Sequence, residues 1–138
     1  MTENARIFNE YLKTQDINLN FLDNNGQTIV ELNEVLEGGI KARLGILFNE
    51  TDSLISVIAL DFIGGINSSK RNKILDLVNE LNSGYSYYKF VVINDSIQIQ
   101  SFISVDNNFE PSILMNYIFG MFDVIKDDYS TIMKAMWS

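Results

Sequence analysis

Residues 40–62 read IKARLGILFNETDSLISVIALDF, and this stretch determines the fold class. In its first part apolar residues alternate with Lys41 and Arg43, the period of two that is typical of a strand with one buried face. In its second part, Leu54–Phe62, nearly every residue is apolar, which favours a central strand covered on both faces. A polar turn at Glu50-Thr51-Asp52 separates the two parts. The stretch therefore predicts an antiparallel hairpin at the centre of a sheet.

Two further strands are predicted upstream of this hairpin. Apolar residues alternate with asparagines from Ile17 to Phe21, which indicates a half-buried strand, and the next strand is expected over Thr28–Leu36. Asn24-Asn25-Gly26 lies between them. Because Asn-Gly tolerates the positive φ angles of a tight turn, the two strands are predicted to form a hairpin.

Helices are predicted at three places. The first covers about Glu3–Gln15, where apolar residues recur at helical spacing. The second begins at the capping residues Asn67 and Ser68 and ends at Gly84. The third is a long helix over Pro111–Trp137, opened by the only proline of the chain and apolar at every third or fourth position.

A second hairpin, Tyr88–Ile93 and Ile97–Val105 around Asn94-Asp95, completes the order α-β-β-β-β-α-β-β-α. This order predicts an α+β fold with a mainly antiparallel five- to six-stranded sheet packed with helices. No repeat or linker divides the chain, so residues 1–138 are expected to form a single domain. The expected core includes Ile46, Ile58, Val78, Leu81, Ile99 and Ile118, and Leu75 is expected on the buried stripe of the second helix.

The composition points away from catalysis and towards binding. The chain has no histidine and no cysteine, which removes the side chains most used for proton transfer, covalent catalysis and transition-metal ligation. We therefore expect no enzymatic activity and no cofactor. The net charge of −8 opposes a phosphate backbone, so nucleic acid is not an expected partner.

Nothing in the sequence predicts a membrane segment. The most apolar stretch, Leu54–Ile66, is interrupted by polar residues and glycines and is shorter than the roughly 20 residues that a membrane helix needs. Residues 1–6 lack the pattern of a secretory signal peptide. A cytoplasmic location is the resulting expectation, and the absence of cysteine agrees with a reducing compartment.

The second half of the chain combines Leu81-Asn82 at the end of the second helix, the aromatic passage Tyr85–Phe90, the hairpin after it, and Phe119, Asp128 and Tyr129 on the last helix. This combination resembles the YbjN-like family of small bacterial proteins. The resemblance covers about Ile7 to Trp137. Members of this family are often described as sensory transduction regulators, and their fold is similar to that of type III secretion chaperones. The resemblance implies a non-catalytic, protein-binding or chaperone-like regulatory module.

The last helix is the predicted partner surface, because its apolar stripe continues to its end and finishes with methionine and tryptophan, which are enriched where proteins meet. We expect this helix and a sheet face to contact a protein partner, a second copy of the chain, or both. The alternative is that the helix end docks on its own sheet. The candidate residues are Tyr117, Met121, Tyr129, Ile132, Met133, Met136 and Trp137.

Three other candidate sites are weighed against structural roles. Gly64–Lys70 leads from a strand into a helix and could receive an anion in a small-ligand sensor, although it matches no phosphate-binding motif. The aromatic residues of Tyr85–Phe90 could stack on a ligand or form core. Asp123, Asp127 and Asp128 could gather around a divalent cation, but carboxylates at this spacing usually form the solvated face of a helix.

Overall fold

The computed structural model describes residues 1–138, and it confirms the predicted α+β class and element order. Three α-helices and six strands are present, with short 3-10 turns at Glu37–Gly39 and Ser68–Lys70. The elements are α1 (Glu3–Thr14), β1 (Phe21–Asn24), β2 (Gln27–Val35), β3 (Lys41–Phe48), β4 (Leu54–Ile63), α2 (Arg71–Ser83), β5 (Lys89–Ile93), β6 (Ser96–Ser104) and α3 (Pro111–Trp137).

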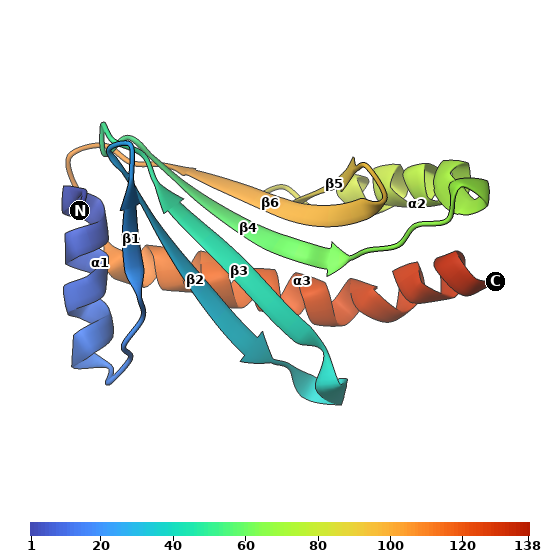
Figure 1. Ribbon diagram of the computed structural model, residues 1–138, viewed down its shortest axis with the longest axis horizontal. Coiled ribbons are helices and arrows are strands. Elements are labelled where there is room, and N and C mark those ends of the chain that lie inside the picture. The colour runs from blue at the N-terminus through green and yellow to red at the C-terminus, as the bar shows by residue number, and fades with distance from the viewer.

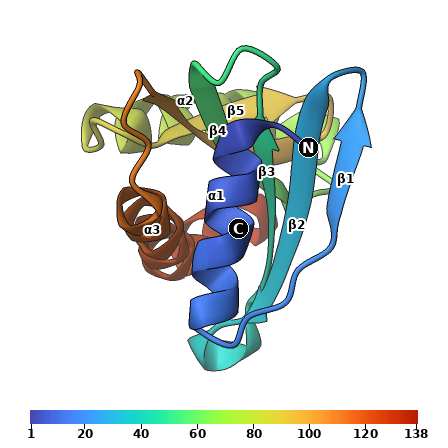
Figure 2. The same ribbon diagram turned by 90° about the vertical axis from the view of Figure 1, so that its left-hand side faces the viewer.

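All six strands form one antiparallel sheet in the order β1-β2-β3-β4-β6-β5. Figure 2 shows the sheet curving around α1 and α3, with α2 beside β5. The inner, concave face therefore carries the core, in which 26 buried apolar residues form one cluster. None of the helices is both long enough and apolar enough to cross a membrane.

The sheet divides at β4. Ala59 pairs with Ile99 and Ile63 pairs with Ile97, so β4 has four steps where β6 has two, and Asp61 adopts a positive φ of 48° in the bulge. Beyond Ala59, β4 stays with β6 while β3 continues away with β2. Figure 1 shows the β2–β3 hairpin diverging from β4 and β6, with α3 running across the division.

Arg43 forms ion pairs across the divided sheet on its outer face. The Arg43 guanidinium on β3 contacts the Glu31 carboxylate on β2 and, at 3.2 Å, the Asp61 carboxylate in the bulge of β4. All three side chains are largely exposed, so solvent weakens these ion pairs. They nevertheless connect β2, β3 and β4 across the outer face.

Two sequence expectations for the strands need correction. The strand predicted over Ile17–Phe21 begins only at Phe21, because pairing with β2 ends at Phe21 opposite Val30. Ile17 and Leu19 alternate with exposed asparagines because they pack against the core, not because they pair. β4 is not covered on both faces: Ile58 is only half-buried, since no helix lies on the outer face of the sheet.

The second helix also differs in detail. Ile74 and Val78 are buried as expected, but Leu81 is half-buried and Leu75 is 40% exposed. The reason is that α2 lies at the edge of the sheet beside β5, so only a narrow stripe of it is covered. The other predicted core residues, Ile46, Ile99 and Ile118, are fully buried.

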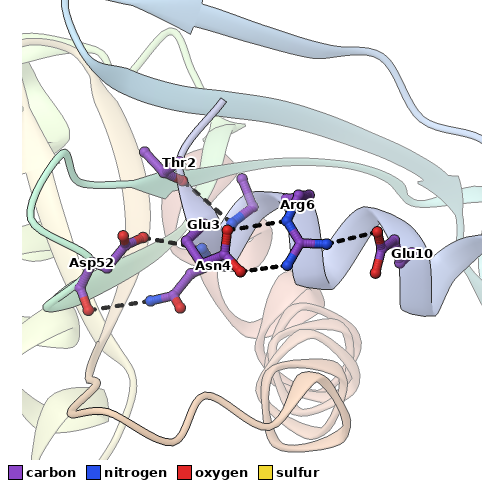
Figure 3. Close-up of polar contacts among 7 residues, drawn as sticks. Thr2, Glu3, Asn4, Arg6, Glu10 and Asp52 are labelled. Carbon is purple, nitrogen blue, oxygen red and sulfur yellow. Dashed lines mark hydrogen bonds and ion pairs between the residues drawn. The ribbon is translucent and has the colours of Figure 1, made fainter.

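The N-terminal helix is fixed by polar contacts with the β3–β4 turn (Figure 3). Thr2 caps α1 by accepting a hydrogen bond from the Ala5 amide. The Asn4 amide donates to the Asp52 carboxylate at 3.0 Å, and the Asn4 side chain donates to the Asp52 carbonyl at 3.2 Å. Next to them, Arg6 contacts the Glu3 and Glu10 carboxylates along the exposed face of the helix. The Asn4–Asp52 bonds hold the start of α1 at this end of the sheet.

A glycine allows a close approach between α3 and the segment before β5. The Tyr88 hydroxyl donates a hydrogen bond to the Tyr117 carbonyl at 2.9 Å, crossing directly over Gly120. A Cβ atom at position 120 would lie 2.1 Å from the Tyr88 hydroxyl oxygen. Tyr88 therefore depends on glycine at this position.

We predict that Gly120→Ala destabilises the protein by about 1–3 kcal/mol, because the methyl group displaces the Tyr88 ring. In an unhindered helix the same change stabilises by roughly 1 kcal/mol, so the sign of the effect is informative. Urea denaturation of the variant measures it. Gly64→Ala is the control, since a Cβ atom there meets no neighbour within 4 Å. A midpoint for Gly120→Ala at or above that of wild type would contradict the packing described here.

Candidate functional site

The chain itself buries part of the predicted partner surface. Met121, Ile132 and Met136 are buried in the core, so a partner cannot reach them in the folded protein. Tyr129 and Met133 are half-buried and pack against the same core. Tyr117 is also half-buried, and its ring meets those of Tyr87 and Tyr88. Only Trp137, at 77% exposure, is free. The end of α3 thus docks largely on its own chain, the alternative stated above.

The accessible apolar surface of α3 lies on a neighbouring face of the helix. Met115, Phe119 and Phe122 follow one another at spacings of four and three residues, which aligns them along α3. Phe119 is 56% exposed, and Met115 and Phe122 are half-buried. None of the three was among the predicted contact residues. The sequence signal that could have indicated this face is Phe119, an aromatic residue that lies outside the predicted buried stripe of the helix.

A groove of about 530 Å³ lies in front of these residues. Its wall opposite α3 is the last part of β2 and the chain after it, including Leu32, Val35 and Leu36, and Ile17 also lines it. Eight of the twelve lining residues are apolar, so the groove resembles a protein-binding or ligand-binding cleft rather than a water channel. An apolar groove of this kind favours an apolar occupant.

Charged residues surround the groove, and most are acidic. Glu34, Glu37, Asp123 and Lys126 contribute to its lining. Lys126 lies 3.5 Å from the Asp123 carboxylate and so is matched by an acid on its own helix. Glu34 and Glu37 are exposed and have no ion pair. The rim therefore carries unbalanced negative charge.

The outer face of the sheet carries a second apolar feature. Leu22, Ile29, Leu47, Ser56 and Phe102 are paired in register, so they form one row across five strands. Leu22 and Phe102 are exposed, and Ile29 and Leu47 are half-buried. No helix covers this row (Figure 2). It is the sheet face that could complement the α3 groove in a protein contact.

The tyrosines of the Tyr85–Phe90 passage have different roles. The Tyr85 hydroxyl donates to the Asp128 carboxylate at 2.7 Å, and burial together with this bond raises the pKa of the Tyr85 phenol above its ordinary value. Burial likewise raises the pKa of Tyr88. Tyr87, by contrast, is exposed and meets the Tyr117 ring edge-on at 5.9 Å. Only Tyr87 is free to stack on a ligand.

In the Gly64–Lys70 corner several of the backbone donors that could receive an anion already have partners. The Asn67 side chain accepts the Ser69 amide at 3.0 Å, and the Asn67 carbonyl accepts the Lys70 amide at 2.8 Å. Two backbone donors at the start of the helical turn are thus used within the turn, and the Ile66 amide donates to the Asp95 carbonyl. A shallow pocket of about 270 Å³ remains, lined by Gly65, Asn67, Lys70, Met136 and Trp137. The fold thereby places the Gly64–Lys70 corner next to Met136 and Trp137 at the end of α3, two candidate sites that were predicted separately.

The acidic residues of α3 do not gather into a metal site. Asp123 faces Lys126, and Asp128 accepts the Tyr85 hydroxyl. No three residues of the types that bind metals, here only Asp and Glu, lie close enough together to hold a metal ion. The expectation that the protein works without a cofactor stays a prediction.

No protein-family model matches the chain, and no similar curated protein was found. The resemblance to the YbjN-like family therefore stays a prediction. Several of the residues that carry it have structural roles: the Asn82 side chain bonds both backbone groups of Phe90 on β5, and Tyr85 bonds Asp128. Phe119 has no such role. It is the residue of this set that the groove leaves accessible.

We predict that Phe119→Ala and Ile118→Ala have very different effects on stability. The Ile118 side chain is completely buried, and its truncation is expected to destabilise the protein by about 2–5 kcal/mol. Phe119 is exposed in the groove, so its truncation is expected to change stability by roughly 0.5 kcal/mol or less. Chemical denaturation measures both. Equal losses of stability would show that the Phe119 side chain packs into the core and does not line an open groove.

We also predict that Tyr85→Phe destabilises the protein by about 1 kcal/mol, because Asp128 loses its hydrogen-bond donor while half-buried. Tyr87→Phe removes an identical hydroxyl that makes no hydrogen bond within the protein, and it is the matched control. Urea midpoints compare the two variants. If they shift alike, the Tyr85–Asp128 bond does not help to fasten α3 to the segment before β5.

Proposed function

We propose that this chain is a non-catalytic, protein-binding module of the regulatory or chaperone-like kind that the YbjN-like family represents. The observation that carries the proposal is the apolar groove between α3 and the end of β2, in which Phe119 is exposed without a structural role. Exposed aromatic residues in concave apolar surfaces are typical of protein contacts. Trp137 and the outer row of the sheet provide further apolar surface.

The chemistry of the groove supports binding rather than catalysis. Its charged groups are exposed carboxylates and one lysine, and no buried polar side chain points into it. The single buried side-chain group without a partner, the Ser101 hydroxyl, lies on β6 outside the groove lining. A general acid or base needs a group held in a defined position against a substrate, and none is present here.

Two further elements belong to this proposal. We propose that the module acts in the cytoplasm, where a protein without cysteine loses nothing in a reducing environment. A second copy of the chain is the alternative partner, and two-fold symmetry would let one patch serve both subunits. The small-ligand sensor at Gly64–Lys70 is the alternative function, supported by the shallow pocket beside Trp137.

A photo-reactive benzoyl-phenylalanine at position 119 tests the proposal in living cells of the source organism. The matched control carries the same residue at position 75, since Leu75 is also an exposed apolar residue on a helix but lies away from the groove. We expect a specific crosslinked product from position 119 and none from position 75. A product of twice the mass of the chain would identify a second copy as the partner.

The outcomes separate the alternatives. Identical products from positions 119 and 75, or no product from either, would contradict a groove that binds proteins. In that case a thermal-shift screen with nucleotides, sugar phosphates and metal ions tests the sensor alternative, because a ligand that binds only the folded state raises the unfolding midpoint.

A further inference from the structure

The edge of β2 beside the groove is unpaired. β1 covers only Gln27–Val30 of β2, and from Glu31 to Val35 no strand lies on that side. The chain before β1 departs at this point, as Figure 1 shows for the segment between α1 and β1. The edge strand at the other side of the sheet, β5, is partly capped, because the Asn82 side chain bonds both backbone groups of Phe90. Uncapped strand edges invite pairing with another chain.

The direction of the backbone groups follows from the register. The Leu36 amide bonds the Ile40 carbonyl, so even-numbered residues at the end of β2 turn their backbone groups towards β3. The backbone groups of Glu31, Asn33 and Val35 therefore point to the free edge. All three residues are exposed, and no backbone or side-chain group of the protein bonds those backbone groups. Three donors and three acceptors are available there.

We infer that this edge and the groove together bind an extended segment of a partner protein, which pairs antiparallel with β2. From N- to C-terminus, three consecutive residues of this segment are a basic residue, a residue of any type and an apolar residue. The inference rests on the proposed function and specifies its partner. Antiparallel pairing of an added peptide strand is an established mode of peptide recognition, in which main-chain bonds give affinity and alternate side chains give specificity.

The pattern of the segment follows from the side chains of β2. Leu32 and Glu34 lie on the inner face, as shown by their pairing with the buried residues Leu44 and Ala42. Partner residues opposite them also face inward, towards the groove. The residue opposite Leu32 meets apolar groove surface, and the residue opposite Glu34 meets a carboxylate. Between these two, the residue opposite Asn33 faces outward and is not restricted in type.

The charges favour a basic partner over a second copy. Glu34 and Glu37 have no cation of their own, whereas the nearby Glu31 is paired with Arg43. In a two-fold pairing of two β2 edges centred on Asn33, Glu34 of each chain would lie opposite Leu32 of the other, and a carboxylate would be desolvated without a partner. The net charge of −8 adds general repulsion between copies.

Selection of displayed random peptides against the wild-type protein tests the inference. We expect the selected peptides to share the basic, any, apolar pattern and to lose about tenfold or more in affinity for Phe119→Ala. The affinity of these peptides for Glu34→Lys should be about tenfold lower. A selection against this variant should yield acidic residues at the basic position instead. Glu80→Lys on α2 is the control, because it makes the same charge change at an exposed residue outside the groove.

N-methylated versions of a selected peptide test the strand pairing. Methylation at the middle residue removes the amide that bonds Asn33 and should weaken binding about tenfold. Methylation at the basic residue alters an amide that points away from β2 and serves as the control. Peptides that need Phe119 but lack the basic residue, or tolerate both methylations equally, would overturn this inference and leave the proposed function intact. If no peptides are selected, or those selected bind Phe119→Ala unchanged, both are contradicted.

Discussion

The packing of one long helix across a divided sheet is the constraint on which the rest of this structure depends. α3 has 27 residues, a length of about 40 Å, and must cover both the β2–β3 hairpin and the β4–β6–β5 half of the sheet. Its fully buried residues, such as Ile118 and Ile132, fill the concave face. Because the bulge at Asp61 separates the halves, one helix cannot fill the space beneath both completely.

The groove is the consequence of this incomplete fit. Where the β2–β3 hairpin diverges, the face of α3 that carries Phe119 is left exposed, and Leu32 remains half-buried on the opposite wall. At the same place, β1 stops pairing with β2. Apolar surface and unused backbone groups thus occur side by side. Each alone is common in proteins, but together they favour a polypeptide as the occupant.

The sequence predicted the fold well because its signals are local. Alternation in Lys41–Phe48, Asn25-Gly26 in the first turn and the 27-residue apolar periodicity of α3 each specify an element without reference to the others. The site was not predictable in the same way. Whether Ile132 or Phe119 is accessible depends on how α3 rotates against the sheet, and the pairing of Ile17–Asn20 depends on where the chain leaves the sheet. Both are properties of tertiary packing.

Amide hydrogen exchange of the free protein, followed residue by residue by NMR, tests the central claim most directly. The amides of Leu32 and Glu34 point towards β3, whereas those of Glu31, Asn33 and Val35 point to the unpaired edge. We predict slow exchange for the first two and fast exchange for the other three, because only hydrogen-bonded amides are protected. Slow exchange at all five positions would show that the edge is already occupied, and would contradict a site that is open for a partner.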